Sequence, residues 1–243
     1  MNKKTIFTAL LIFAFSLKTE NSGTMNHKPD WDPISEIESF DEIVKEDIVD
    51  YFHSLIATYN PNADKSTTEF ILYAMENYGL NKTKKITLWS FYQILLESSG
   101  FHKKDGVIIE SYAGALGITQ ITIPTAYDYM VNIMNKQEKE HFVNLGGTLI
   151  DTNSEEAKKT SRHISNETRK KVKIWLENEQ NAILLWAFIM SKNIEKYGYI
   201  NALVIYNAGL GGWKKIGIAP EKHSYIQGIK KVERFLSNKK RQP

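Results

Sequence analysis

The sequence predicts a mostly α-helical protein with one compact domain and an N-terminal helical extension. Apolar residues recur at helical spacing through most of the chain, and no stretch of any length alternates strongly between apolar and polar residues, as a half-buried strand would. The chain has 243 residues, of which 42% are hydrophobic, so it can bury a core of its own. It contains no internal repeat, which makes one domain the simplest organisation.

Residues 1–25 have the pattern of an export signal. MNKK supplies positive charge, and the uncharged apolar run TIFTALLIFAFSL follows at 5–17. A membrane-spanning helix needs roughly 20 such residues, so this run is short for a span and suits the apolar region of a signal peptide. We therefore assign 1–25 to a signal peptide, or to an N-terminal anchor if it is not cleaved. In both cases the body of the protein is expected to be exported.

Three helices are predicted before residue 100. The first covers about 35–58 and belongs to the N-terminal extension, residues 26–60, which ends at the chain-breaking NPN at 60–62. The run STTE at 66–69 resembles a capping box that opens the second helix, which stops near Gly79. The third helix carries the apolar sequence LWSFYQILLE and ends around Glu97.

The chain after residue 100 is less regular at first. Residues 101–125 contain the turn-like HKKDG and the helix breakers of GALG, so the next helix is expected near Thr125. The charged insertion at about 131–178 is compatible with a helical hairpin or a mobile segment, and a solvated excursion is the favoured interpretation. Further helices are predicted over 181–197, 201–213 and 224–237, with Gly209 closing the second of them.

Composition and motifs exclude several classes of function. The net charge is +3, and without the first 26 residues it is +1 (28 basic minus 27 acidic), so we expect no nucleic-acid partner. The absence of cysteine excludes disulfides, thiolate metal sites and cysteine nucleophiles. The six histidines are scattered and form no zinc-binding pattern, and the chain has neither a G-x-S-x-G elbow nor a phosphate-binding glycine loop. Chemistry carried out by carboxyl groups is the class of function that these exclusions leave open.

Glu97 is the strongest candidate for that chemistry. It stands at the carboxyl end of an apolar helix, where unpaired carbonyls and the helix dipole disfavour a negative charge. Partial burial beside Leu95, Leu96 and Phe101 would disfavour the charge further. Both effects raise the pKa of a carboxyl group toward the value that a general acid needs near neutral pH.

Several short blocks follow Glu97 in a characteristic order. They are Glu97-Ser98, SYAGALGITQ at 111–120, PTA at 124–126, an asparagine-bearing helix at Asn181 and YNAG at 206–209, and AMENYGLN at 74–81 precedes them. In this order they resemble the SLT-type lytic transglycosylases of the goose-type lysozyme superfamily. The resemblance covers roughly 62–130 and 178–236. It implies a lysozyme-like transglycosylase domain over 61–243.

The resemblance also implies which residues bind substrate. Glu97 would be the catalytic acid and base. The residues that the matching blocks place at the substrate are Ser98, Ser111, Gln120, Asn181, Tyr206, Asn207 and Glu221. The glycines of GALG would let the backbone approach a sugar closely, Gln120 would offer its amide, and Tyr206 would bring a phenol within reach of the acid.

The family's reaction uses one acid in place of the two carboxylates of most glycosidases. The resemblance implies cleavage of the β-1,4 bond between N-acetylmuramic acid and N-acetylglucosamine, with formation of a 1,6-anhydro ring. This reaction needs neither a metal nor a cofactor. Peptidoglycan strands are therefore the expected partner, the periplasm is the expected location, and the protein is expected to act as a monomer.

Two departures from the family pattern keep alternatives open. The loop between Glu97 and Gly114 is longer than usual, and the insertion at 131–178 exceeds the family's link. A lysozyme-like hydrolase is one alternative, with Asp105 or Glu110 of the long loop holding the water. The other is a non-catalytic peptidoglycan-binding protein whose insertion recruits an envelope-assembly partner.

Overall fold

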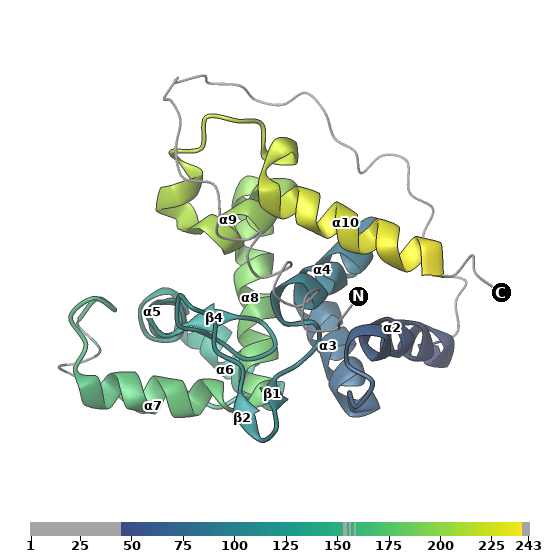
Figure 1. The fold of residues 1–243 in the computed structure, drawn as a ribbon. Coiled ribbons are helices and arrows are strands. Elements are labelled where there is room, and N and C mark those ends of the chain that lie inside the picture. The colour runs from purple at the N-terminus through teal and green to yellow at the C-terminus, as the bar shows by residue number, and fades with distance from the viewer. Residues whose placement is uncertain (1–44, 153–154, 156, 158, 240–243) are drawn as a thin grey trace.

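The computed structural model describes residues 45–152, 155, 157 and 159–239 (Figure 1). These residues are mostly helical, with a few short strands, so the predicted fold class is confirmed at that level. The predicted signal segment at 1–25 and the first part of the helix predicted at 35–58 lie outside the described residues.

The three helices predicted before residue 100 are present as α2 (Lys45–Tyr59), α3 (Lys65–Asn77) and α4 (Lys84–Ser98). The start of α3 differs from the prediction, because Asp64 caps it and accepts a hydrogen bond from the backbone N–H of Ser66. A carboxylate is a strong N-cap, so the helix begins before the STTE run. Phe52, Leu55 and Ile56 of α2 are buried in the same core as α3 and α4.

Two small antiparallel hairpins interrupt the segment that was expected to be irregular. Strands β1 (Lys103–Lys104) and β2 (Val107–Ile108) pair around Asp105 and Gly106, which both have positive φ as a tight hairpin turn requires. Strands β3 (Ala115–Leu116) and β4 (Ile121–Thr122) form the second hairpin. Helix α5 (Ile123–Tyr127) follows directly, capped by Thr122.

The insertion at 131–178 is folded onto the core, so the expected solvated excursion is wrong. After the π-helix η2 (Asp128–Ile133) come α6 (Lys136–Asn144) and α7 (Asn166–Leu176). The apolar side chains that this region buries are Phe142, Leu145, Ile150, Ile164, Val172, Trp175 and Leu176. They are separated by charged residues, which made the segment look solvated, but on α7 the buried positions recur at helical spacing.

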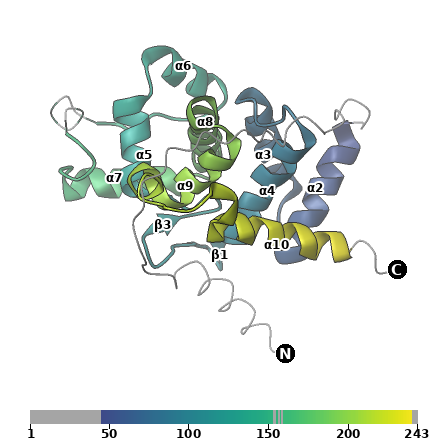
Figure 2. The same ribbon diagram turned by 90° about the horizontal axis from the view of Figure 1, so that it is seen from above.

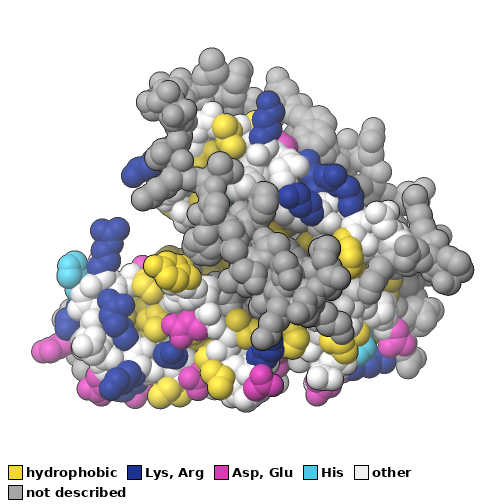
Figure 3. Space-filling model, viewed as in Figure 1, with side chains coloured by type: hydrophobic (Ala, Val, Ile, Leu, Met, Phe, Trp, Pro, Cys, Tyr) yellow, Lys and Arg dark blue, Asp and Glu magenta, His cyan; other side chains and the backbone are white. Residues whose placement is uncertain are grey.

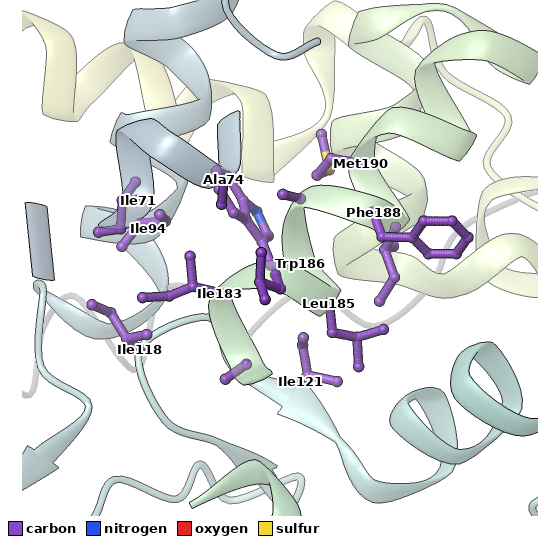
Figure 4. Packing of buried hydrophobic residues seen from close by; sticks show 14 of the residues in the cluster. Ile71, Ala74, Ile94, Ile118, Ile121, Ile183, Leu185, Trp186, Phe188 and Met190 are labelled. Atoms are coloured by element: carbon purple, nitrogen blue, oxygen red, sulfur yellow. The ribbon is translucent and has the colours of Figure 1, made fainter. Parts of the chain in front are cut away.

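Helix α8 (Glu179–Tyr197) is the centre of the molecule, and it contacts α3, α7, α9 and η2. Figures 1 and 2 show α2, α3 and α4 on one side of it and α5 to α7 on the other. Trp186 of α8 is fully buried and lies near Ala74 and Met190 in the layer that joins α8 to α3 and α4 (Figure 4).

The C-terminal third closes this arrangement. Helix α9 (Tyr199–Trp213) is interrupted at Gly209, which has φ 68° and ψ 159°, so the residue ends the first helical segment as predicted but a further turn follows. The short 3-10 helix η4 (Pro220–Lys222) leads into α10 (Ser224–Lys239), which packs against α4 and α9.

The surface carries both signs of charge. Figure 3 shows Lys and Arg side chains gathered over α10, whereas they alternate with Asp and Glu along the lower edge of the view. None of the helices described is long and apolar enough to span a bilayer.

Candidate active site

A cleft of about 1820 Å³ runs across the molecule past the end of α4. Its walls come from the end of α2, the loop before β3, the segment from α5 to α6, the second half of α8, and α9. Pockets for small molecules commonly measure about 300–1,000 Å³, so this cleft has room for an extended ligand. Glu97 is one of the residues that line it.

Glu97 occupies the last turn of α4, and the helix ends immediately afterwards. Ser99 adopts the left-handed conformation with φ 57° and its N–H bonds the carbonyl of Leu95 at 2.9 Å. The Glu97 side chain is partly buried against the walls of the cleft. Burial deprives the carboxylate of water and raises the pKa of Glu97 from 4.5 to about 7. The pKa shift expected from the sequence is therefore confirmed in direction, with burial as the main cause.

Tyr225 is the hydrogen-bond partner of this acid. It lies near the start of α10, and its hydroxyl donates to Glu97 Oε1. This bond stabilises the charged carboxylate and lowers the pKa of Glu97, which offsets part of the effect of burial. Burial, followed by the nearby Glu97 charge, raises the pKa of Tyr225 well above its usual value, so the phenol stays a donor. Sequence reasoning missed Tyr225 as a site residue, although it lies four residues after Glu221, which was predicted to bind substrate.

Tyr206 of α9 lines the cleft near the acid but does not bond to it. Its hydroxyl donates to the carbonyl of Thr119 at 2.6 Å. Burial raises the pKa of Tyr206 well above its usual value, and the charge of Glu97 raises it further. The Tyr206 hydroxyl therefore lies within electrostatic range of the Glu97 carboxyl, and its hydrogen bond to Thr119 connects α9 to the β3–β4 hairpin.

Gln120 also lines the cleft, with a local bond that holds its side chain. Its Nε2 donates to the carbonyl of Gly117 at 2.8 Å, and its backbone has φ 54°, an uncommon value for a residue with a side chain. The side-chain amide is thereby held at the cleft wall.

Gly117 allows close packing against a neighbouring side chain, whereas the resemblance implied that it lets the backbone approach a sugar. A Cβ at this position would lie 2.6 Å from His102 Nδ1. His102 is buried, accepts from the N–H of Ile118 at Nδ1 and contacts the carbonyl of Glu177 through Nε2 at 2.9 Å. The His102 ring therefore joins the long loop to the end of α7.

Three more predicted residues lie along the cleft. Ser98 and Ser111 both line it, but their hydroxyls are engaged locally. Ser98 Oγ donates to the carbonyl of Ile94 at 3.1 Å, and Ser111 Oγ accepts from the N–H of Ala115 at 3.0 Å. Asn207 lines the cleft and is exposed. The structure thus brings Ser98, Ser111 and Asn207 to one surface with Glu97.

Asn181 and Glu221, the other two residues predicted to bind substrate, are not among the described residues that line the cleft. Asn181 is buried in α8, where Nδ2 donates to Thr148 Oγ1 at 2.9 Å and Oδ1 accepts from the N–H of Thr148 at 2.9 Å. Its amide anchors the insertion. Glu221 lies in η4, and its carbonyl accepts from Gln227 Nε2 at 2.7 Å.

Two acidic residues of the long loop were candidates for a second carboxylate. Glu110 lines the cleft and forms an ion pair with Lys173 of α7 at 2.9 Å. Asp105 is exposed in the β1–β2 turn and does not line the cleft. Within the described part of the chain, no three acidic or histidine side chains are grouped so that they could share a metal ion.

Comparisons with known proteins identify no relative of this chain. No protein-family model matches it, and neither a curated protein nor a solved structure matches it.

Proposed function

We propose that this protein is a peptidoglycan lytic transglycosylase with a lysozyme-like domain, which acts on glycan strands in the periplasm. The observation that carries the proposal is the setting of Glu97. One carboxyl group stands at the wall of a long cleft, with a pKa near 7 caused by burial and a tyrosine donor on one oxygen. Such a group is protonated often enough to act as an acid and ionised often enough to act as a base at neutral pH.

The proposed reaction uses Glu97 twice. The protonated carboxyl gives its proton to the glycosidic oxygen, and the bond from that oxygen to C1 of the muramic acid breaks. The substrate's own 2-acetamido group stabilises the positive charge at C1. The Glu97 carboxylate then takes the proton of the C6 hydroxyl, whose oxygen bonds to C1 and closes the 1,6-anhydro ring. The acid regains its proton, so the step balances without water.

Tyr225 supports both stages. Its hydroxyl holds Glu97 Oε1 and stabilises the carboxylate that exists between the two proton transfers. Because its pKa is raised well above the usual range, Tyr225 remains protonated and does not compete for the proton.

Glu110 and its ion pair bear on the alternative of hydrolysis. A hydrolase on this scaffold would need a second carboxylate to hold a water molecule or to attack the sugar. Glu110 is the cleft-lining candidate of the long loop, and its carboxylate is engaged by Lys173. The size of the cleft supports a polymeric substrate for either reaction.

Digestion of purified sacculi tests the proposal. Wild-type protein is expected to release soluble muropeptides that end in 1,6-anhydromuramic acid, whereas Glu97→Gln is expected to release none above background. Glu110→Gln is the matched control and should keep both the rate and the anhydro product. Equal release by wild type and Glu97→Gln would refute the catalytic role, and reducing ends that disappear with Glu110→Gln would establish hydrolysis.

A further inference from the structure

A buried amide lies directly beneath the candidate acid. Gln93 precedes Glu97 by one helical turn on α4, so the two side chains share a face of the helix. The Gln93 side chain is 0% exposed. A glutamine amide in such a place needs partners for an oxygen and for two N–H groups, because water does not reach it.

One end of this amide is held by α8. Trp186 is fully buried, and its Nε1 donates to Gln93 Oε1 at 3.2 Å. Figure 4 shows the indole pointing out of α8 into the layer that faces α3 and α4. An indole N–H can only donate, so it selects the amide orientation in which the oxygen faces Trp186 and the nitrogen faces away.

The other end of the amide is unsatisfied. Gln93 Nε2 is buried and has no hydrogen-bond partner among the described residues. Leaving a buried donor unpaired is costly, and α10, which carries Tyr225, packs against α4. The amide lies close enough to lower the pKa of Tyr225, although the two groups are not in hydrogen-bond geometry.

The Tyr225 hydroxyl has one proton and can also accept. Its proton is given to Glu97 Oε1. Its lone pairs are therefore the acceptors available to the buried nitrogen of Gln93. A donor at that position would prevent the hydroxyl from turning its proton away from the acid.

We propose that Gln93 is a positioning residue that donates from Nε2 to the Tyr225 oxygen and so directs the only proton of that phenol onto Glu97 Oε1. The chain of donors runs from Trp186 on α8 through Gln93 on α4 and Tyr225 on α10 to the acid. It holds one carboxyl oxygen of Glu97 in place and leaves the other for the substrate. The significance for catalysis rests on the proposed function, but the hydrogen-bond chain itself does not.

The titratable neighbours of Glu97 set the background for a test. They are Tyr225 from α10 and Tyr206 from α9, whose pKa values are both raised well above the usual range, and Glu110 lines the same cleft. The two phenols stay neutral while Glu97 titrates. Its titration between pH 4 and 9 therefore reports on the donor that it receives.

The test follows the titration of the Glu97 carboxyl by NMR in protein whose glutamate side chains are labelled with ¹³C. The resonance that is missing from the spectrum of Glu97→Gln belongs to Glu97. Gln93→Met, which keeps the size of the side chain and removes the amide, is expected to raise the pKa of Glu97 by about 0.5, since a neighbouring donor strengthens a hydrogen bond by a fraction of its energy. Trp186→Phe, which frees the Gln93 amide to turn, should raise the pKa of Glu97 by a smaller amount.

A double mutant separates positioning from burial. In a Tyr225→Phe background, Gln93→Met should cause no further rise, because its effect passes through the phenol. Ser90→Ala is the matched control: it removes a buried contact between α4 and Tyr199 at 3.2 Å and should leave the Glu97 titration unchanged. A rise of the same size in both backgrounds, or none in either single variant, would overturn the inference.

The activity measurement completes the test. Muropeptide release by Gln93→Met should fall by about tenfold, as expected when a catalytic group loses its alignment. If wild-type protein releases no muropeptides, the proposed function fails, while the titration of Glu97 still decides on the role of Gln93.

Discussion

Replacing Glu97 with glutamine is expected to stabilise the protein, and to do so only when the solution is less acidic than about pH 5. Burial raises the pKa of Glu97 from 4.5 to about 7, which means that the folded protein holds this carboxyl in its neutral form over a range where the unfolded chain ionises it. A neutral amide of the same shape avoids that conflict. The stability gain therefore reports on the buried acid independently of any substrate.

The magnitude follows from the linkage between protonation and folding. Each pH unit between the unfolded and folded pKa costs the wild-type protein about 1.4 kcal/mol of stability. Because the Glu97 side chain is partly exposed in the cleft, we expect the total loss of stability of the wild-type protein to be about 2–3 kcal/mol. The wild-type protein should lose this stability as the pH rises from 4.5 to about 7, and the loss should be complete above pH 7.

Urea unfolding of both proteins from pH 4 to pH 8 is the assay. At pH 4 their free energies of unfolding should be nearly equal, and at pH 8 Glu97→Gln should be the more stable, which corresponds to roughly 5–10 °C in melting temperature for a chain of this size. Glu69→Gln, at an exposed position on α3, is the matched control and should show no such difference. A stability difference between wild type and Glu97→Gln that stays constant across this range would refute the assignment of Glu97 as a buried acid.

Three further predictions follow from named contacts. Tyr225→Phe removes a hydrogen bond to a charged group, worth about 1.5–3 kcal/mol, so the pKa of Glu97 should rise by about 1–2 and the alkaline loss of muropeptide release should move to higher pH. Asn181→Leu removes the anchor of the insertion and should lower the free energy of unfolding by about 1–3 kcal/mol. It should leave the pH profile of muropeptide release unchanged, and a displaced profile would show that Asn181 acts in the site. Gly117→Ala places a methyl group against His102 at a backbone with φ 69°, so it should cost about 2–4 kcal/mol by chemical denaturation, and a neutral result would show that the loop can shift.

The insertion illustrates what periodicity alone leaves undecided. Its apolar residues, such as Phe142 and Trp175, are outnumbered by charged neighbours, so the composition of the segment indicated a solvated excursion. Whether an amphipathic stripe packs on the core depends on a complementary surface elsewhere in the chain. Here α5 and α8 supply that surface, since α7 packs against both and Asn181 of α8 bonds to Thr148.

Local sequence by itself determined the helical class, the approximate bounds of α4 and the placement of Glu97 at a helix end. These features depend on residues within a few turns of one another, which spacing and end signals describe well. The tertiary structure decided which tyrosine meets the acid. Tyr225 is 128 residues away from Glu97 in sequence, and it bonds to the acid because α10 packs across α4, whereas Tyr206 bonds to the carbonyl of Thr119. The same packing of three helices brings Trp186, Gln93 and Tyr225 together, and no local pattern encodes a meeting of side chains from α8, α4 and α10.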